Sequence, residues 1–334
     1  MAYTTINKHT AHFNTKLYTG DGNTSKAITG VGFQPDLVWI RNRPDARDHH
    51  WYDVVRGTNK VIGSDRNAAE ATVTNGVTAF GTDGFTVGND ANVNDNGDSH
   101  VSWCWKAGTT GSGTSTGSGT GKAYSYSVNT TSGFSIVKYV GNGSAGHTIP
   151  HHLGQAPTFT IVKALGLTES WQIICAGLDA DKFIQLNSTS AEVSQSSYNR
   201  FNSTRPSSTV VTLGSDDHTN KNDNNFIMYN FCNVDGFSKS GSYEGNNNSS
   251  DNAFIYTGFK PKFLILKNVD ATADWVMQDD KRNPINPREN VLLANTSGAE
   301  ADWSSYPIDM LSNGFKIRNN GQGSGTSHTF IYMA

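Results

Sequence analysis

Three absences narrow the range of proteins that this sequence can encode. Charged residues make up only 16% of the chain, and the formal net charge is −3. Since no basic excess is present to attract a phosphate backbone, we do not expect nucleic acid as a partner. No stretch approaches the length of apolar residues that a membrane-spanning helix needs, so we expect no membrane insertion either.

Cysteine is also scarce. The three cysteines, Cys104, Cys175 and Cys232, are odd in number and lie in apolar or aromatic segments. We therefore expect buried free thiols rather than disulfide bonds. Residues 1–6 lack the basic start and apolar run of a secretory signal, so we expect a protein that is made in a cytoplasm and remains soluble.

Short strand-like runs and turns are abundant, by contrast. Residues 37–40, 159–163 and 263–267 are rich in β-branched and aromatic side chains and are bounded by Pro and Gly. Pairs such as Asn75-Gly76 favour tight turns between antiparallel strands. No segment shows a 3.6-residue apolar period over three turns. The pattern predicts an all-β fold made of antiparallel β-sandwich or jelly-roll units.

One order of motifs occurs three times along the chain. Each repeat opens with a phenylalanine, contains a proline just before a strand, and closes on an aromatic strand. The prolines are Pro35, Pro157 and Pro261, and they follow the opening phenylalanines by 22, 23 and 24 residues (13 to 35, 134 to 157, 237 to 261). We therefore expect three units of one topology in tandem.

The repeats define a domain organisation. It consists of an N-terminal arm (residues 1–12), three β-sandwich units (13–108, 124–236 and 237–334) and a linker (109–123) between the first two units. The linker is built almost only from Gly, Ser and Thr, a composition typical of flexible coils, although packing within a larger assembly would order it. We expect the first unit to be posed separately and the other two to form a rigid tandem.

Two kinds of cluster in the sequence, one of histidines and one of Asn and Asp residues, offer ligands that a metal ion could use. His147, His151 and His152 could bind zinc, with residues 48–50 added, but no Cys or carboxylate stands beside them at ligand spacing. The Asn/Asp runs at residues 90–98 and 216–223 offer oxygen ligands for calcium, yet the first run lacks the closing glutamate of an EF-hand. We expect no metal and no cofactor, with calcium as the alternative.

An enzyme is not indicated. Carboxylates for glycoside cleavage would be sought among Asp274, Asp279, Asp280 and Glu300. Adjacent acids on a strand point to opposite faces, and we see no acid that recurs across the repeats as a shared active site would require. No Gly-x-Ser-x-Gly elbow precedes a helix. We therefore expect no catalytic residue.

Several tryptophans have two interpretations. Trp39, Trp103 and Trp105 lie in strand runs and are expected in the core. Trp51, Trp171 and Trp275 fall at a matching place after the proline-led strand of each repeat. They are either part of the fold architecture or a platform that contacts a sugar or a protein, so they are the candidate binding residues.

Parts of the chain are similar to a known family. Residues 32–43, 54–57, 67–70 and 101–108 resemble a repeat of unknown function in virion structural proteins of tailed bacteriophages, especially aquatic ones. The resemblance is good over the first repeat and looser over the other two. It implies a fold like the concanavalin A or laminin G β-sandwich, and a tail-fibre, tail or minor structural protein. No catalytic residue attaches to the family motif.

Together these observations lead to an expected function. We expect a non-enzymatic virion component, an appendage of the tail, tail fibre or capsid surface, located in the virion after synthesis in the host cytoplasm. Its expected partners are other virion proteins and further copies in a homo-oligomer, with a host-surface glycan or receptor as a possible contact. The alternative is a carbohydrate-binding, lectin-like module acting alone.

Overall fold

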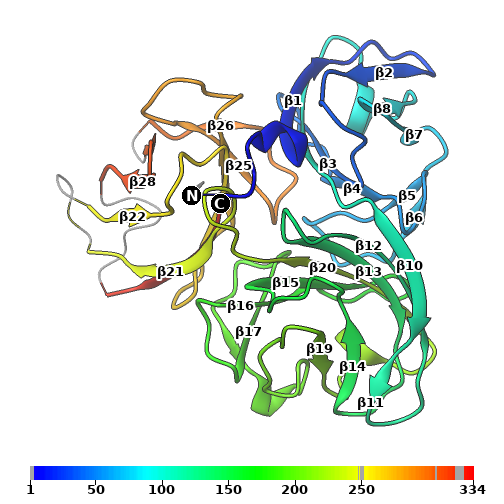
Figure 1. Cartoon of the computed structure of the whole chain (residues 1–334). Coiled ribbons are helices and arrows are strands. Elements are labelled where there is room, and N and C mark those ends of the chain that lie inside the picture. Colours follow the sequence, from blue (N-terminus) through cyan, green and yellow to red (C-terminus); the bar gives the residue numbers. More distant parts are fainter. Residues whose placement is uncertain (1–3, 247, 249–251, 305–306, 320–326) are drawn as a thin grey trace.

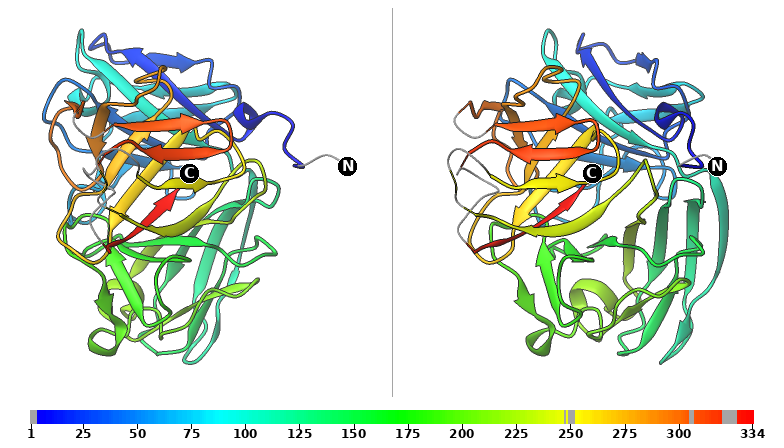
Figure 2. Two further views of the ribbon diagram at one scale, coloured as in Figure 1. Left: turned by 90° about the vertical axis from the view of Figure 1, so that its left-hand side faces the viewer. Right: turned by 60° about the vertical axis from the view of Figure 1, so that its left-hand side comes forward.

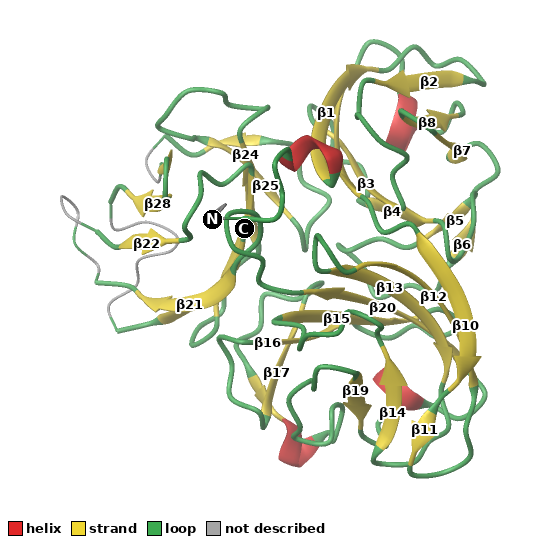
Figure 3. Ribbon diagram, in the orientation of Figure 1, coloured by secondary structure: helices red, strands yellow, loops and turns green. Residues whose placement is uncertain are grey.

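The structure of the chain, a computed structural model, is built almost entirely from β-strands. It describes residues 4–246, 248, 252–304, 307–319 and 327–334. Helices within these residues are short turns: η1 (His9–Ala11), α1 (Ala91–Asn94), η2 (Gln195–Ser197) and α2 (Asp217–Asn220) (Figure 3). None of them is long and apolar enough to cross a membrane. The prediction of an all-β fold with antiparallel sheets is confirmed.

Unit 1 contains two main sheets. Its larger sheet has the order β1 (Phe13–Thr19), β9 (Ser99–Trp105), β3 (Leu37–Asn42) and β4 (His50–Asp53). Its smaller sheet has the order β2 (Lys26–Thr29), β8 (Gly84–Val87) and β7 (Val77–Gly81). The short strands β5 (Lys60–Val61) and β6 (Ala71–Thr72) pair beside them.

Unit 2 has the same two layers with additions. Its larger sheet has the order β10 (Thr109–Thr114), β12 (Ala123–Asn129), β13 (Phe134–Val140), β20 (Asn225–Phe231), β15 (Phe159–Ala164), β16 (Gln172–Cys175), β17 (Lys182–Gln185) and β18 (Val193–Ser194). Its smaller sheet has the order β11 (Thr116–Gly117), β14 (His147–Pro150) and β19 (Val210–Leu213).

Unit 3 closes the chain with the same pattern. Its larger sheet has the order β21 (Ser240–Glu244), β29 (Thr329–Met333), β23 (Phe263–Asn268), β24 (Val276–Asp279), β25 (Asn290–Leu293) and β26 (Ala301–Asp302). Its smaller sheet has the order β22 (Phe254–Tyr256), β28 (Gly314–Ile317) and β27 (Ile308–Leu311).

The three larger sheets share one strand order. In each unit the strand that opens the repeat (β1, β13 or β21) pairs with the last strand (β9, β20 or β29), the last strand pairs with a central strand, and the central strand pairs with the next one along the chain. The central strands β3, β15 and β23 begin two residues after Pro35, Pro157 and Pro261. The expected common topology is therefore present in these four strands of each larger sheet, whereas the smaller sheet of unit 2 differs from the other two. Figure 1 shows the three units arranged around a common centre, and Figure 2 shows them from two other sides.

Each central strand lies between two cores, which explains its unbroken apolar run. In β3, Val38 and Ile40 point into a core between the two sheets of unit 1, whereas Leu37 and Trp39 point into a second core. This alternation is the period of two expected of a strand. Strands β15 and β23 alternate in the same way, and all residues of the three strands are buried. The second core contains residues of all three units.

The shared core overturns the expectation that unit 1 is posed separately. Trp105 of unit 1 lies 6.1 Å from Phe231 of unit 2 and 5.7 Å from Phe263 of unit 3, measured between ring centroids. Separating unit 1 would expose this aromatic surface to water. The free energy lost by that exposure is larger than the conformational entropy that residues 109–123 would gain as a flexible segment. The three units therefore form one body rather than a tandem pair with a tethered neighbour.

Residues 109–123 are not a flexible linker. Strand β10 pairs along its length with β12, and β11 pairs with β14. The glycines allow this, because a Cβ on Gly111 would lie 2.5 Å from the hydroxyl of Tyr126, its cross-strand partner. Gly113 faces Tyr124 in the same way. Tyrosine rings thus cover the glycine positions, and the segment becomes the edge of the larger sheet.

The N-terminal arm is described from residue 4, so its first three residues lie outside the described part. Thr4 packs against Gly236, and the carbonyl of His12 accepts a hydrogen bond of 2.8 Å from the amide of Lys106. The arm therefore contacts both unit 1 and the segment that leads into unit 3. All three cysteines are buried and free, as the sequence predicts.

Candidate functional site

The predicted tryptophan platform is not on the surface. Trp51, Trp171 and Trp275 are 1%, 0% and 0% exposed and belong to the shared core. A sugar has no access to a ring that the neighbouring units cover. The binding-platform interpretation of these residues is therefore wrong, and the architectural interpretation is right, because the repeats fold against one another.

The strand register also revises which residues are equivalent. Asp53, Cys175 and Asp279 each pair with the first residue of the central strand in their unit. Counting back four residues from these three positions leads to His49, Trp171 and Trp275. Trp51 lies two positions further along than the other two tryptophans. Sequence spacing alone had aligned it wrongly.

The equivalent side chains make equivalent contacts between units. Trp171 donates from Nε1 to the carbonyl of Gly63 (2.8 Å), and Trp275 donates to the carbonyl of Gln185 (2.9 Å). His49 places Nε2 3.0 Å from the carbonyl of Leu293. Burial lowers the pKa of His49 well below its ordinary value, so the ring is neutral. Its Nδ1 then accepts from Trp39 and its Nε2 donates to Leu293.

Each unit also has a buried cation at one equivalent position, and this cation contacts a neighbouring unit. Arg41, Lys163 and Lys267 occupy equivalent positions of the central strands, each six residues after the strand's proline, and all are 0% exposed. Arg41 donates to the carbonyls of Ser297 and Gly298 in unit 3. Every buried charge needs hydrogen-bond partners, and here the partners belong to another unit.

The two lysines complete the cycle. Lys163 donates from Nζ to the carbonyl of Asn67 in unit 1 (3.2 Å), and Lys267 donates to the carbonyl of Thr189 in unit 2 (3.1 Å). Each also donates to a carbonyl of its own unit. Together with Arg41, the contacts run from unit 1 to unit 3, from unit 3 to unit 2 and from unit 2 to unit 1.

The three units are arranged as a closed ring around their common centre. Backbone hydrogen bonds also join neighbouring units of this ring, with donor and acceptor units in the opposite order to that of the buried cations. The amides of three glutamates, each directly before a short strand (β6, β18 or β26), donate to carbonyls of another unit. The pairs are Glu70 to Leu165 (2.8 Å), Glu192 to Val269 (2.8 Å) and Glu300 to Arg43 (2.7 Å). These glutamates are acids that recur in all three repeats, contrary to the sequence expectation. They recur for their place in the ring and do not gather into one site.

Among the described residues, two of the three interfaces also contain a buried ion pair. Asp53 binds Arg56 and accepts from the hydroxyl of Tyr229 of unit 2 (2.7 Å). Asp279 binds Arg282 and accepts from Nε1 of Trp103 of unit 1 (3.2 Å). Asp279 and Asp280, two of the candidate acids for glycoside cleavage, therefore have separate partners. Asp279 belongs to this interface, and Asp280 forms an ion pair with Lys262.

Because Lys163 and Lys267 are buried, we expect the free energy of unfolding to depend on pH above neutrality. Burial lowers the pKa of Lys163 and of Lys267 to about 8, from an ordinary value of 10.5. Between these values the unfolded chain binds more protons than the folded chain. Both groups therefore make folding more favourable as pH rises through this window, by up to about 1.4 kcal/mol per pH unit each.

Denaturant titrations at several pH values between 7.5 and 10 would measure this effect. The informative quantity is the difference between the native protein and the Lys163→Met/Lys267→Met variant, because other groups titrate equally in both. The native protein should gain stability relative to the variant as pH rises. Equal pH slopes for the two proteins would contradict the expectation.

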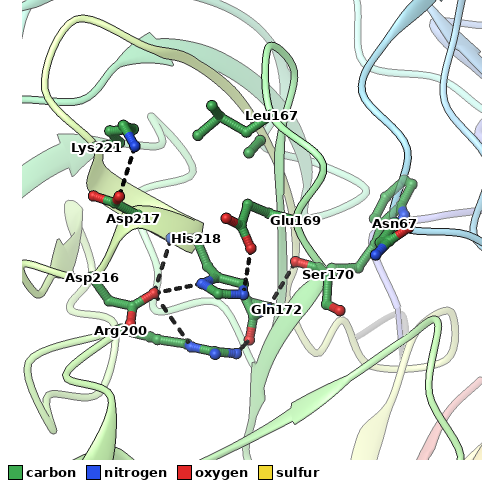
Figure 4. Close-up of polar contacts among 12 residues, drawn as sticks. Asn67, Leu167, Glu169, Ser170, Gln172, Arg200, Asp216, Asp217, His218 and Lys221 are labelled. Carbon is green, nitrogen blue, oxygen red and sulfur yellow. Dashed lines mark hydrogen bonds and ion pairs between the residues drawn. The ribbon is translucent and has the colours of Figure 1, made fainter.

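A surface cluster on unit 2 is the arrangement nearest to a catalytic one (Figure 4). His218 lies between two carboxylates, with Nε2 2.6 Å from Glu169 and Nδ1 2.9 Å from Asp216. Arg200 lies 3.5 Å from Asp216 and contacts Gln172. Both ring nitrogens are occupied by carboxylates, so the imidazole has no nitrogen left to activate a nucleophile.

The same cluster is absent from unit 1. There, Arg47 and Asn92 stand where unit 2 has Glu169 and His218. Asp216 caps the first turn of α2 by accepting from the amide of His218 (2.9 Å). The cluster therefore fixes α2 against the loop before β16, through contacts that unit 1 does not have.

The candidate zinc ligands do not come together. His147 bonds Ser115 and Asn220, His151 bonds the carbonyl of Ser207, and His152 stacks on Tyr126 with ring centroids 3.8 Å apart. Burial lowers the pKa of all three imidazoles. Each ring is used within the fold of unit 2.

The described residues contain one group of three possible metal ligands, Asp45, Asp95 and Asp98. Arg47 lies 3.7 Å from Asp45 and 2.5 Å from Asp95. A guanidinium thus supplies positive charge where a cation would bind. Asp90, the first residue of the run that offered calcium ligands as the alternative, caps α1.

Searches among curated proteins and among solved structures gave no match. The family model described as Domain of unknown function (DUF7483) matches residues 8–334. Because this match spans all three units and the segments that join them, the chain belongs to the DUF7483 family.

Proposed function

We propose that the chain is a non-enzymatic structural protein of a tailed-bacteriophage virion. In this proposal it is an appendage of the tail, tail fibre or capsid surface, and its outer loops contact the host surface. The resemblance of residues 32–43 and 101–108 to repeats of such proteins supports the proposal. The two-layered units agree with the concanavalin A-like β-sandwich that the resemblance implies, and we propose that fold for each unit.

The observation that carries the proposal is the use of the buried polar groups. Arg41, Lys163 and Lys267 each join one unit to another, and so do Asp53 and Asp279. In enzymes, titratable groups with shifted pKa values commonly gather in an accessible cleft. Here these groups form contacts that hold the three units rigidly together. Such rigidity suits a structural protein that must keep its shape on a virus particle.

Attachment would use the sheet edges that remain open. In unit 2, β12 covers the outer edge of β13. The equivalent strands β1 and β21 end their sheets without such a partner among the described residues. Open edges accept an added strand from another chain. We propose other virion proteins and further copies of this chain as the partners, arranged on a symmetric platform.

One observation favours the lectin-like alternative. Phe254 and Tyr256 alternate on β22 and are 45% and 56% exposed. Flat exposed rings of this kind can stack on a pyranose. These two residues lie on the smaller sheet of unit 3 and replace the buried tryptophans as the candidate residues for this alternative.

Quantitative mass spectrometry of purified phage particles tests the proposal. We expect the chain in a fixed copy number per particle, and retained after washing at high salt. A chain that is missing from particles, and that binds a host glycan until Tyr256→Ala removes the binding, would replace the structural role with the lectin-like one.

A further inference from the structure

Strand β10 forms an outer edge of the molecule. It ends the larger sheet of unit 2, so β12 pairs with one of its edges and no described strand pairs with the other. Figure 1 shows β10 at the outside of the three units. The strand is polar, because all its residues are Thr, Gly or Ser. A strand added at this edge would therefore be held by backbone hydrogen bonds rather than by an apolar surface.

Alternate residues of β10 direct their backbone groups away from β12. The amide of Ser115 donates to the carbonyl of Lys122 (2.7 Å), one step beyond the last pair of the two strands. Residues of an antiparallel strand bond to one partner alternately, so the residues two, four and six positions before Ser115 also bond to β12. The amides and carbonyls of Thr110, Ser112 and Thr114 therefore point to the open side.

This edge lacks the features that usually keep an edge strand from pairing with another chain, which are charges, prolines and bulges. The strands that end the larger sheets of units 1 and 3 on the same side do carry charges, with Lys16 at the centre of β1 and Glu244 at the end of β21. Pairing of β1 with itself about its centre would place two Lys16 side chains opposite each other, which is unfavourable. Strand β10 has no charge and no proline, and its register with β12 is continuous.

One antiparallel register lets β10 pair with itself completely. If Ser112 faces Ser112 of a second copy, Thr110 faces Thr114 of that copy, and every outward amide lies opposite an outward carbonyl. The two glycines of β10 then face each other, so no side chains collide on their side of the strand. The hydroxyls of Thr110, Ser112 and Thr114, all exposed, can hydrogen-bond across the two strands.

We propose that β10 is a self-association edge, at which two copies of the chain pair antiparallel and join their larger sheets into one continuous sheet. The interface is isologous, and a neutral strand meets its own copy across the two-fold axis without repulsion. Six residues a side are few beside the ~20–30 of a standard protein interface, so free chains associate weakly. Pairing becomes strong where copies are held close together, as on a particle.

Analytical ultracentrifugation of the full chain over a series of concentrations tests the pairing. We expect reversible dimers of the native chain. Ser112→Lys and Ser112→Glu should each weaken dimerisation at least about tenfold, because like charges would then face each other across the two-fold axis. An equimolar mixture of the two variants should restore the dimer. A native chain that stays monomeric throughout would overturn the proposal, and so would a mixture that dimerises no better than either variant alone.

Thr29→Lys is the matched control for the place of the interface. Thr29 is exposed on β2, which is an edge strand of the smaller sheet of unit 1. The variant adds the same charge to another edge, so it should leave dimerisation unchanged. Equal weakening by Thr29→Lys and Ser112→Lys would refute β10 as the interface. Thermal denaturation of all variants would establish that they are folded.

Ser112→Pro tests whether backbone groups make the contact. Proline is tolerated on an edge strand where the amide faces solvent, and here it would remove an outward donor without removing a bond to β12. We expect weaker dimers, whereas unchanged dimerisation would contradict strand pairing. These measurements use the isolated chain and are independent of the virion role. A chain that dimerises through β10 but is missing from particles would lose the virion role and keep this interface.

Discussion

Replacing Asp279 by alanine should lower the free energy of unfolding by about 3–5 kcal/mol. The side chains of Asp279 and Arg282 are both 0% exposed, with 2.5 Å between Oδ2 and Nε. Without the carboxylate, the buried guanidinium of Arg282 keeps only Glu300 as an ion-pair partner, and Nε1 of Trp103 loses its acceptor. Urea denaturation at neutral pH would measure the loss.

Unit 2 supplies the matched control for this variant. Cys175 is equivalent to Asp279, and Leu178 stands three residues later, where unit 3 has Arg282. Both unit 2 residues lie in the shared core. The double variant Asp279→Cys/Arg282→Leu copies that apolar pair, so it should lose much less stability than the single variant. A double variant less stable than Asp279→Ala would contradict this account of the interface.

Truncating Trp275 to alanine should cost about 3–5 kcal/mol, because it empties a large fully buried site between units 2 and 3. Trp275 is 0% exposed and packs 6.4 Å from Phe159, measured between ring centroids. Trp275→Phe keeps a ring but leaves the carbonyl of Gln185 without its donor, so its cost should be intermediate.

Chemical denaturation of three variants checks this ranking. Tyr256→Ala is the control for the loss of an aromatic side chain, because Tyr256 is 56% exposed and should change stability by less than about 0.5 kcal/mol. The expected order of destabilisation is Trp275→Ala, then Trp275→Phe, then Tyr256→Ala. Similar losses of unfolding free energy for all three variants would mean that the buried contacts at the centre of the three units contribute no more to stability than an exposed side chain does.

The local structure could be predicted from the sequence wherever a strand and its flanking residues carried the information. The proline-led runs became β3, β15 and β23, and Trp39, Trp103 and Trp105 are buried as expected. Repetition of motifs also predicted the common strand order, since each repeat has the same strands to pair.

The arrangement of the units could not be predicted in the same way, because it depends on surfaces that meet only after folding. The Gly/Ser/Thr composition of residues 109–123 predicted a coil, but strands β10 and β11 form there by pairing with β12 and β14. One usable signal was missed. A cation stands six residues after the proline in every repeat, at Arg41, Lys163 and Lys267, although buried strands rarely carry charge.

Aligning tryptophans by spacing was misleading for a related reason. Trp51 fills the position of Ile173 and Met277, while His49 takes the place of the other two tryptophans. A neutral imidazole and an indole both donate one N–H to a carbonyl, so the contact is preserved although the residue type changes. Hydrogen-bond geometry, which the sequence does not display, identifies the equivalence.

The central claim is that the three units are one cooperative body. Hydrogen exchange at increasing denaturant, followed by mass spectrometry of peptides from β3, β15 and β23, tests it most directly. If the ring opens as a whole, the slowest amides of all three strands will exchange with one common free energy of opening. Exchange of the β3 peptide at distinctly lower denaturant than the other two would show that unit 1 opens independently and would contradict the closed ring.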